Sequence, residues 1–177
     1  MKLFIGCGSE NVDEKYLKNS RELVQKIAAM EDVDLVFGAY DHGMMGAVYH
    51  EFLKNHKKIT GITIEEYASQ LDELQLDDSI VAKTTMDRMR ELYHHCDKIL
   101  LLPGGLGTYT ELFCSIEEHR TMMDDKEIIL YNDGFFYTPL IEELYHLFER
   151  GFSSKNVSEF LHIESDQEEI LKLIKKK

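Results

Sequence analysis

The stretch DKILLLPGGLGTYTE, residues 97–111, decides the fold, because it joins a buried strand to a helix through a glycine-rich loop. Residues 99–102 (ILLL) form a short apolar run, which is typical of an interior strand in a parallel sheet. Three glycines follow within four positions, at Gly104, Gly105 and Gly107, and Thr108 supplies a hydroxyl at the start of the next helix. Glycines let a backbone pass close to a ligand. This unit therefore predicts a ligand site beyond the carboxyl end of a strand.

The alternation of short apolar runs and longer amphipathic stretches extends over the whole chain. We expect strands at residues 3–7, 33–37, 58–64, 97–102, 127–131 and 160–163, and helices at residues 11–30, 43–55, 79–95, 107–123 and 137–150. A last helix is expected to open with a capping box of Ser165 and Glu168, and residues 65–78 are expected to be an irregular connection. This order predicts a single α/β domain over residues 1–177, a Rossmann-like three-layer sandwich with a mostly parallel central sheet and helices on both faces.

The composition excludes several classes of partner. The 177 residues carry 20 Lys and Arg against 33 Asp and Glu, a formal net charge of −13, which argues against binding to nucleic acid polymers or anionic membranes. Apolar runs are far shorter than a membrane-spanning helix requires, and the N-terminus lacks a signal-peptide core. The odd number of cysteines at wide spacings indicates reduced thiols in a cytoplasmic protein. No clustered ligand set for a metal is apparent.

Three glycine loops are expected at the carboxyl ends of strands. They contain Gly8 and Ser9, Gly43, and the segment 103–108, and we count all of these among the candidate nucleotide-binding positions. Neither the dinucleotide fingerprint nor the P-loop pattern occurs. Free amides and the helix dipole after Gly104 would bind an anion without a lysine, and Glu111 lies one turn into that helix. The alternative interpretation is a tight turn in which Thr108 caps the helix and Glu111 only favours the dipole.

The string PGGLGTYTE, residues 103–111, resembles the PGGxGTxxE signature of the LONELY GUY (LOG) family of nucleoside-monophosphate phosphoribohydrolases, whose members are often mislabelled as lysine decarboxylases. Residues 3–9 (LFIGCGS) are similar to the first strand and turn of that family, and residues 35–46 to its second glycine motif. Arg88 stands at the position of the family's arginine, with the same spacing to the signature glutamate. The resemblance covers most of the chain in order.

The resemblance implies a Rossmann-like homodimer that hydrolyses the N-glycosidic bond of a nucleoside 5′-monophosphate, AMP-like or cytokinin-like, to a free base and ribose 5-phosphate. Glu111 and Arg88 would be the catalytic pair, and Gly104, Gly105, Gly107 and Thr108 would hold the phosphate. No metal or organic cofactor is implied. Lysine decarboxylase activity is not expected, because that chemistry requires a pyridoxal phosphate lysine and no lysine lies in the glycine loops.

Two departures from the family pattern leave an alternative open. Ala39 and Tyr40 replace two glycines of the second motif, and Glu10 stands where a small hydroxyl residue is usual. These residues favour a non-catalytic protein of the same fold that binds a nucleotide or a phosphorylated metabolite. The joint presence of Arg88 and Glu111 favours hydrolysis, because a pure binding protein has no evident need for both.

Overall fold

The computed structural model describes residues 1–10, 13–122, 126–154 and 156–176. Within these residues, seven strands form one sheet in the order β4-β3-β2-β1-β5-β6-β7, and every neighbouring pair is parallel. The strands are β1 (Lys2–Gly6), β2 (Asp34–Phe37), β3 (Ile59–Ile64), β4 (Asp78–Ala82), β5 (Lys98–Leu101), β6 (Ile128–Tyr131) and β7 (His162–Glu164).

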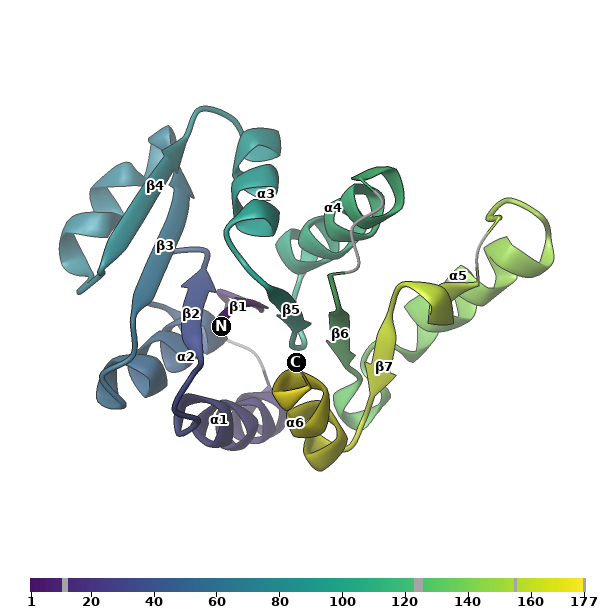
Figure 1. Ribbon diagram of the computed structural model, residues 1–177, viewed down its shortest axis with the longest axis horizontal. Coiled ribbons are helices and arrows are strands. Elements are labelled where there is room, and N and C mark those ends of the chain that lie inside the picture. Colours follow the sequence, from purple (N-terminus) through teal and green to yellow (C-terminus); the bar gives the residue numbers. More distant parts are fainter. Residues whose placement is uncertain (11–12, 123–125, 155, 177) are drawn as a thin grey trace.

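Helices cover both faces of this sheet (Figure 1). One face carries α1 (Glu14–Ala28), α2 (Gly43–Lys54) and α6 (Gln167–Lys175), and the other carries α3 (Thr85–His94), α4 (Leu106–Met122) and α5 (Thr138–Glu149). Successive strand residues point to opposite faces, so Leu3 and Ile5 pack with the first layer and Phe4 with the second. The predicted Rossmann-like three-layer sandwich is confirmed. Short 3₁₀ helices occur at η1 (Glu65–Glu73), η2 (Asp133–Phe135) and η3 (Val157–Glu159).

The helix predicted over residues 79–95 is wrong in its first part. Residues 78–82 form the edge strand β4, which pairs with β3 from Thr60 opposite Asp78 to Ile64 opposite Ala82. The strand lacks a buried apolar run, since Val81 is 44% exposed, so its formation depends on pairing with a distant segment. The helix α3 begins only at Thr85, where Thr84 accepts a hydrogen bond from the amide of Asp87.

The predicted capping box at Ser165 is also wrong. Asp166 is the N-cap of α6 and accepts a hydrogen bond from the amide of Glu168 (2.7 Å), whereas the hydroxyl of Ser165 donates to the carbonyl of Asn132 (3.2 Å). The carboxylate of Asp166 takes the capping position because Ser165 is held by the loop after β6. The last strand runs over His162–Glu164, so it begins two residues and ends one residue later than expected. The predicted helix ends at residues 11 and 123 lie outside the described residues.

No helix in the described part of the chain is both long and apolar enough to span a membrane.

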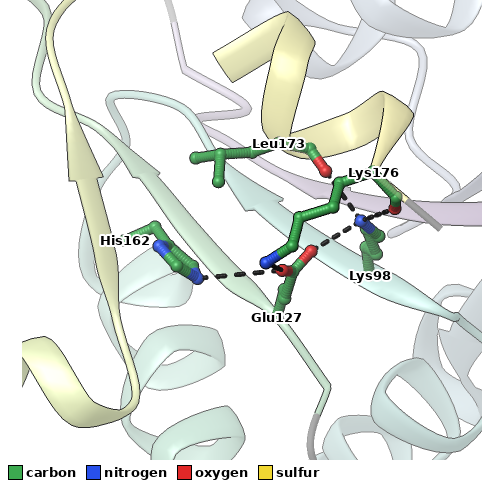
Figure 2. Close-up of polar contacts among 5 residues, drawn as sticks. All are labelled: Lys98, Glu127, His162, Leu173 and Lys176. Atoms are coloured by element: carbon green, nitrogen blue, oxygen red, sulfur yellow. Dashed lines mark hydrogen bonds and ion pairs between the residues drawn. The ribbon is translucent and has the colours of Figure 1, made fainter. Parts of the chain in front are cut away.

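A polar cluster holds the end of α6 against the amino ends of β5 and β6 (Figure 2). The ammonium of Lys98, on β5, donates to Oε2 of Glu127 (2.5 Å) and to the backbone carbonyls of Leu173 (2.7 Å) and Lys176 (2.6 Å). The ammonium of Lys176 reaches Oε1 of the same glutamate at 3.2 Å. Burial opposes ionisation of Glu127, but the hydrogen bonds from the two lysines hold its pKa below the ordinary value. The half-buried Lys98 thus satisfies two of the carbonyl groups at the end of α6.

Lys98→Met should lower the free energy of unfolding by about 2 kcal/mol, because the carbonyls of Leu173 and Lys176 lose their donor and Glu127 keeps the exposed Lys176 in place of the half-buried Lys98. Chemical denaturation measures this loss. Lys26→Met is the matched control, since Lys26 pairs with Glu168 at 2.9 Å on the surface and its removal should leave the denaturation midpoint nearly unchanged. Equal shifts in the two variants would contradict the role given to Lys98.

Candidate active site

Two glycine loops meet where the order of the sheet reverses. β1 lies between β2 and β5, and the helices that follow β1 and β5 lie on opposite faces (Figure 1). The amide of Gly8 donates to the carbonyl of Pro103 (3.4 Å), and the amide of Leu102 donates to the carbonyl of Gly6 (2.9 Å). The loops after β1 and β5 therefore run side by side at the switch point, where doubly wound folds bind ligands.

Gly104 has no space for a side chain. A Cβ atom there would lie 2.1 Å from Oγ1 of Thr108 and 2.9 Å from the amide nitrogen of Gly8. Thr108 is 2% exposed, and its Oγ1 has no hydrogen-bond partner among the described residues. A buried hydroxyl without a partner is costly, so this oxygen is a group that a ligand would satisfy.

Gly105 and Gly107 differ from Gly104, because a Cβ atom at either position would meet nothing within 4 Å. Their side of the loop therefore faces open space. The helix α4 begins at Leu106, and the first amides of a helix have no partner within it. Free amides, the positive end of the helix dipole and open space together form a place where an anion would bind.

Arg88 and Glu111 form an ion pair in the wall of one cavity, which the two glycine loops also line. Oε1 of Glu111 lies 3.6 Å from Nη2 of Arg88, while Nε of Arg88 donates to the carbonyl of Ile62 (3.0 Å). The arginine comes from α3 and the glutamate from α4. Oε2 of Glu111 is buried and has no hydrogen-bond partner in the described part of the chain. The carboxylate is thus oriented by one charged group and has one oxygen free for a ligand or water.

Two glycines at the ends of strands make room for this pair. A Cβ atom at Gly6, on β1, would lie 2.6 Å from Oε2 of Glu111, and one at Gly38, after β2, would lie 2.4 Å from Nη2 of Arg88. A methyl group at either position would displace the carboxylate or the guanidinium from its present place.

Burial raises the pKa of the Glu111 carboxyl to about 7, although the charge of Arg88 opposes the shift. The same surroundings affect Cys7, since burial, with the charge of Glu111 added, raises the pKa of its thiol well above the ordinary value. A carboxyl group that titrates near neutral pH can both accept and return a proton, which is the property required of a general base or acid. Cys7 remains a neutral thiol.

The raised pKa of Glu111 predicts a pH dependence of stability. The folded state binds the proton more tightly than the unfolded chain, so stability should fall as the pH rises from 4.5 to about 7. Glu111→Gln cannot ionise, and its stability relative to the parent chain should increase by about 1–2 kcal/mol between about pH 5 and about pH 8. Urea denaturation at the two pH values measures the difference, and a decrease would contradict a buried Glu111 carboxyl.

All but one of the site residues predicted from the sequence line the same cavity. Eight of them line a cavity of about 500 Å³: Gly8, Ser9, Arg88, Gly104, Gly105, Gly107, Thr108 and Glu111. Gly43 does not line it. It has a φ of 57°, and a Cβ atom there would lie 2.6 Å from the carbonyl oxygen of Ser9. Gly43 therefore packs against the backbone of the loop after β1, outside the cavity.

Sequence reasoning missed part of the cavity wall. Met45, Tyr16 and Phe136 line it, and the rings of Tyr16 and Phe136 meet edge to face at 5.3 Å. Nothing in the sequence joins residue 16 to residue 136, and a methionine has no polar group that would mark it as a ligand-binding residue. Glu10, which departs from the family pattern, also lines the cavity.

Comparison with known proteins agrees with the resemblance. A family model described as "Possible lysine decarboxylase" matches residues 45–174. A probable cytokinin riboside 5′-monophosphate phosphoribohydrolase of Oryza sativa is 25% identical over 152 residues, which cover 85% of this chain and 62% of that protein. A cytokinin riboside 5′-monophosphate phosphoribohydrolase of Arabidopsis thaliana is 23% identical over 172 residues, which cover 97% of this chain and 80% of that protein. The chain thus spans less than two thirds of the length of the rice relative.

Solved structures with the same fold include two proteins described by a different ligand. The molybdenum cofactor binding protein of Rippkaea orientalis has a TM-score of 0.70 at 23% identity, and the match covers 98% of this chain and 94% of that protein. The molybdenum cofactor carrier protein of Chlamydomonas reinhardtii has a TM-score of 0.68 at 17% identity, and the match covers 98% of this chain and 95% of that protein. These likenesses show the fold. From the family model, which matches most of the chain, and from the named relatives, the chain belongs to the LONELY GUY family, whose model is described as possible lysine decarboxylases.

Proposed function

We propose that this chain hydrolyses the N-glycosidic bond of a nucleoside 5′-monophosphate and releases the base and ribose 5-phosphate. The observation that carries the proposal is the Arg88–Glu111 pair, 3.6 Å apart, in one cavity with the free start of α4. The relatives named as phosphoribohydrolases support the same reaction class.

The chemistry follows from these positions. The phosphate binds at the first turn of α4, through backbone amides and the hydroxyl of Thr108, and so fixes the ribose over the carboxylate. Water attacks C1′ while the bond to the base breaks, and the base leaves with the bonding electrons and takes up the proton that the attacking water loses. Glu111 either receives the proton of that water or stabilises the positive charge that develops on the sugar. Arg88 orients the carboxylate and favours its ionised form.

Release of base from a panel of nucleotides tests the proposal. The chain is incubated with AMP, GMP, CMP and UMP, and with adenosine as the matched compound without phosphate. We expect release from at least one nucleotide and none from adenosine. Release from adenosine at the same rate would refute phosphate anchoring at α4.

Gly38→Ala should change the geometry of the site, and with it the activity, while leaving the stability of the fold nearly unchanged. The new methyl group would displace the end of the flexible Arg88 side chain, which can move without disturbing the backbone. We therefore expect kcat for base release to fall about 10²-fold, because a displacement of about 1 Å at a reacting group has that effect. The thermal midpoint, measured in parallel, should change little. Full activity in this variant would show that the position of Arg88 is unimportant.

A second candidate function is binding of a nucleotide or a phosphorylated metabolite without turnover. The side chain of Tyr40, at a position where the family has glycine, lines a cavity beside the candidate site and favours this alternative. Tight binding of a nucleotide with no release of base from any member of the panel would establish it. The lysine decarboxylase suggested by the family description is not proposed, since no lysine is among the described residues that line the cavity.

A further inference from the structure

A buried tyrosine contacts both ends of the glycine loop at residues 103–108, which we call the phosphate loop. Tyr137 lies between β6 and α5 and is 1% exposed. Its hydroxyl donates to the carbonyl of Leu102 (2.6 Å), the last residue before the phosphate loop. The centroid of its ring lies 5.7 Å from that of Tyr109, the first residue after this loop. One side chain therefore holds the two points between which the phosphate loop is suspended.

The carbonyl of Leu102 needs the hydrogen bond that Tyr137 provides. The pairing of β5 with β6 ends at Leu101 opposite Leu130, so Leu102 lies beyond it, and this residue is fully buried. A buried carbonyl without a donor is costly. Loss of the phenol hydroxyl would thus favour movement of the backbone at the point where the phosphate loop begins.

The phenol also contacts the phosphate loop itself. Burial raises the pKa of Tyr137 well above its ordinary value, although a hydrogen bond from the backbone amide of Gly104 opposes the shift. The hydroxyl therefore keeps its proton and remains a donor to Leu102. A Cβ atom at Gly104 would overlap the hydroxyl of Thr108, so the position of Gly104 fixes the space around that hydroxyl. Movement of the first residues of the phosphate loop would disturb this group.

Tyr137 is itself held firmly by its own segment. Oδ1 of Asn132 accepts from the amide of Tyr137 (2.8 Å), and Nδ2 of the same asparagine donates to the hydroxyl of Thr138 (3.2 Å). The amide of Asn132 donates to the carbonyl of Glu164 (2.8 Å), at the end of β7. These bonds tie the segment to two strands of the sheet, so Tyr137 is a fixed support for the phosphate loop.

We infer that Tyr137 is a positioning residue for the proposed reaction, whose hydroxyl holds the phosphate loop in the conformation that binds the 5′-phosphate. This inference rests on the proposed function. Tyr137 does not line the cavity, so it would act through the phosphate loop without touching the substrate. If the phosphate loop adopts the binding conformation only about a tenth of the time, the apparent affinity for a phosphate ester falls about tenfold.

Tyr137→Phe tests the inference, because it removes the hydroxyl and keeps the ring. Deuterium exchange of the amides in residues 104–108, followed by mass spectrometry, should become about tenfold faster in this variant. Calorimetric titration should show ribose 5-phosphate binding about tenfold weaker. In the base-release assay KM should rise by a similar factor while kcat changes less than about twofold, because the bound phosphate restores the conformation of the phosphate loop.

Tyr131→Phe is the matched control. Tyr131 is a buried tyrosine of β6 whose hydroxyl accepts from Nε2 of Gln167 (3.2 Å), and it does not line the cavity. Each substitution removes one buried hydroxyl and should lower the thermal midpoint by about 2–4 °C. The exchange of the phosphate loop, the affinity for ribose 5-phosphate and KM should change in Tyr137→Phe and stay constant in Tyr131→Phe.

Three outcomes would overturn the inference. Unchanged exchange or unchanged affinity in Tyr137→Phe would show that the hydroxyl does not hold the phosphate loop. Equal changes in both tyrosine variants would reduce its role to general stability. A parent chain that does not bind ribose 5-phosphate would exclude a phosphate site at the phosphate loop. Failure of the proposed function is distinct, since it is the absence of base release from the parent chain, and the exchange and titration experiments require no turnover.

Discussion

Glu111→Gln should reduce the release of base from AMP by about 10³-fold or more, since the amide can neither accept a proton nor carry the charge that stabilises the sugar cation. The side chain is 4% exposed, with Oε2 free of partners in the described residues, so no other group supplies these roles at that point. In the parent chain the rate should rise with pH through the pKa of about 7 that burial gives Glu111. Single-turnover chromatography over a pH series measures both effects.

The control for this variant is Glu117→Gln, on the same helix. Glu117 is exposed and pairs with Arg120, so its change should leave the rate unaffected. The size and shape of glutamine match those of glutamate, and circular dichroism should show an unaltered fold. Retained turnover in Glu111→Gln would remove this residue from the chemistry.

Arg88→Ala should have the second largest effect, a loss of about 10²-fold in kcat. Its diagnostic feature is the pH profile. The charge of Arg88 lowers the pKa of Glu111, so its removal should raise that pKa further and move the rising limb of the profile to higher pH. Arg88→Lys keeps the charge but not the planar donor group that reaches Ile62 and Glu111 together, and should recover only part of the rate.

Arg90→Ala is the matched control for Arg88. Arg90 lies two residues further along α3, its side chain is 69% exposed, and it contacts Glu118 at 3.4 Å on the surface. Its removal should change neither the rate nor the pH profile. An unshifted profile in Arg88→Ala would show that the charge of Arg88 does not act on Glu111.

The strands of the sheet interior could be predicted because their own residues specify them. The runs around Leu3, Leu35 and Leu100 are apolar on both faces, and glycines end two of them. β4 could not be predicted in this way. It is an edge strand whose backbone pairs with β3, and its exposed Val81 breaks the pattern of burial. Pairing between distant segments decides such a strand, and local sequence carries little of that information.

The candidate site was accessible from sequence for a related reason. The loop from Gly104 to Thr108 and its glutamate are contiguous, and the arginine stands at a fixed spacing before them. The walls of both cavities come from segments that are distant in sequence. Tyr16 and Phe136 meet only through folding, and Tyr67 lies in a polar segment that had no periodic pattern.

The net charge of −13 bears on how the phosphate is recognised. A strongly acidic surface gives no long-range attraction for a nucleotide. At the proposed site, a phosphate would therefore be recognised by local groups: the open start of α4, the hydroxyl of Thr108 and the charge of Arg88.

Product analysis of AMP incubated with the purified chain tests the central claim most directly. Adenine and ribose 5-phosphate are quantified together by chromatography coupled to mass spectrometry. The account predicts equal amounts of the two products from the parent chain and neither from Glu111→Gln. Formation of adenosine and phosphate instead, or binding of AMP with no product from it or from any other nucleoside monophosphate, would contradict it.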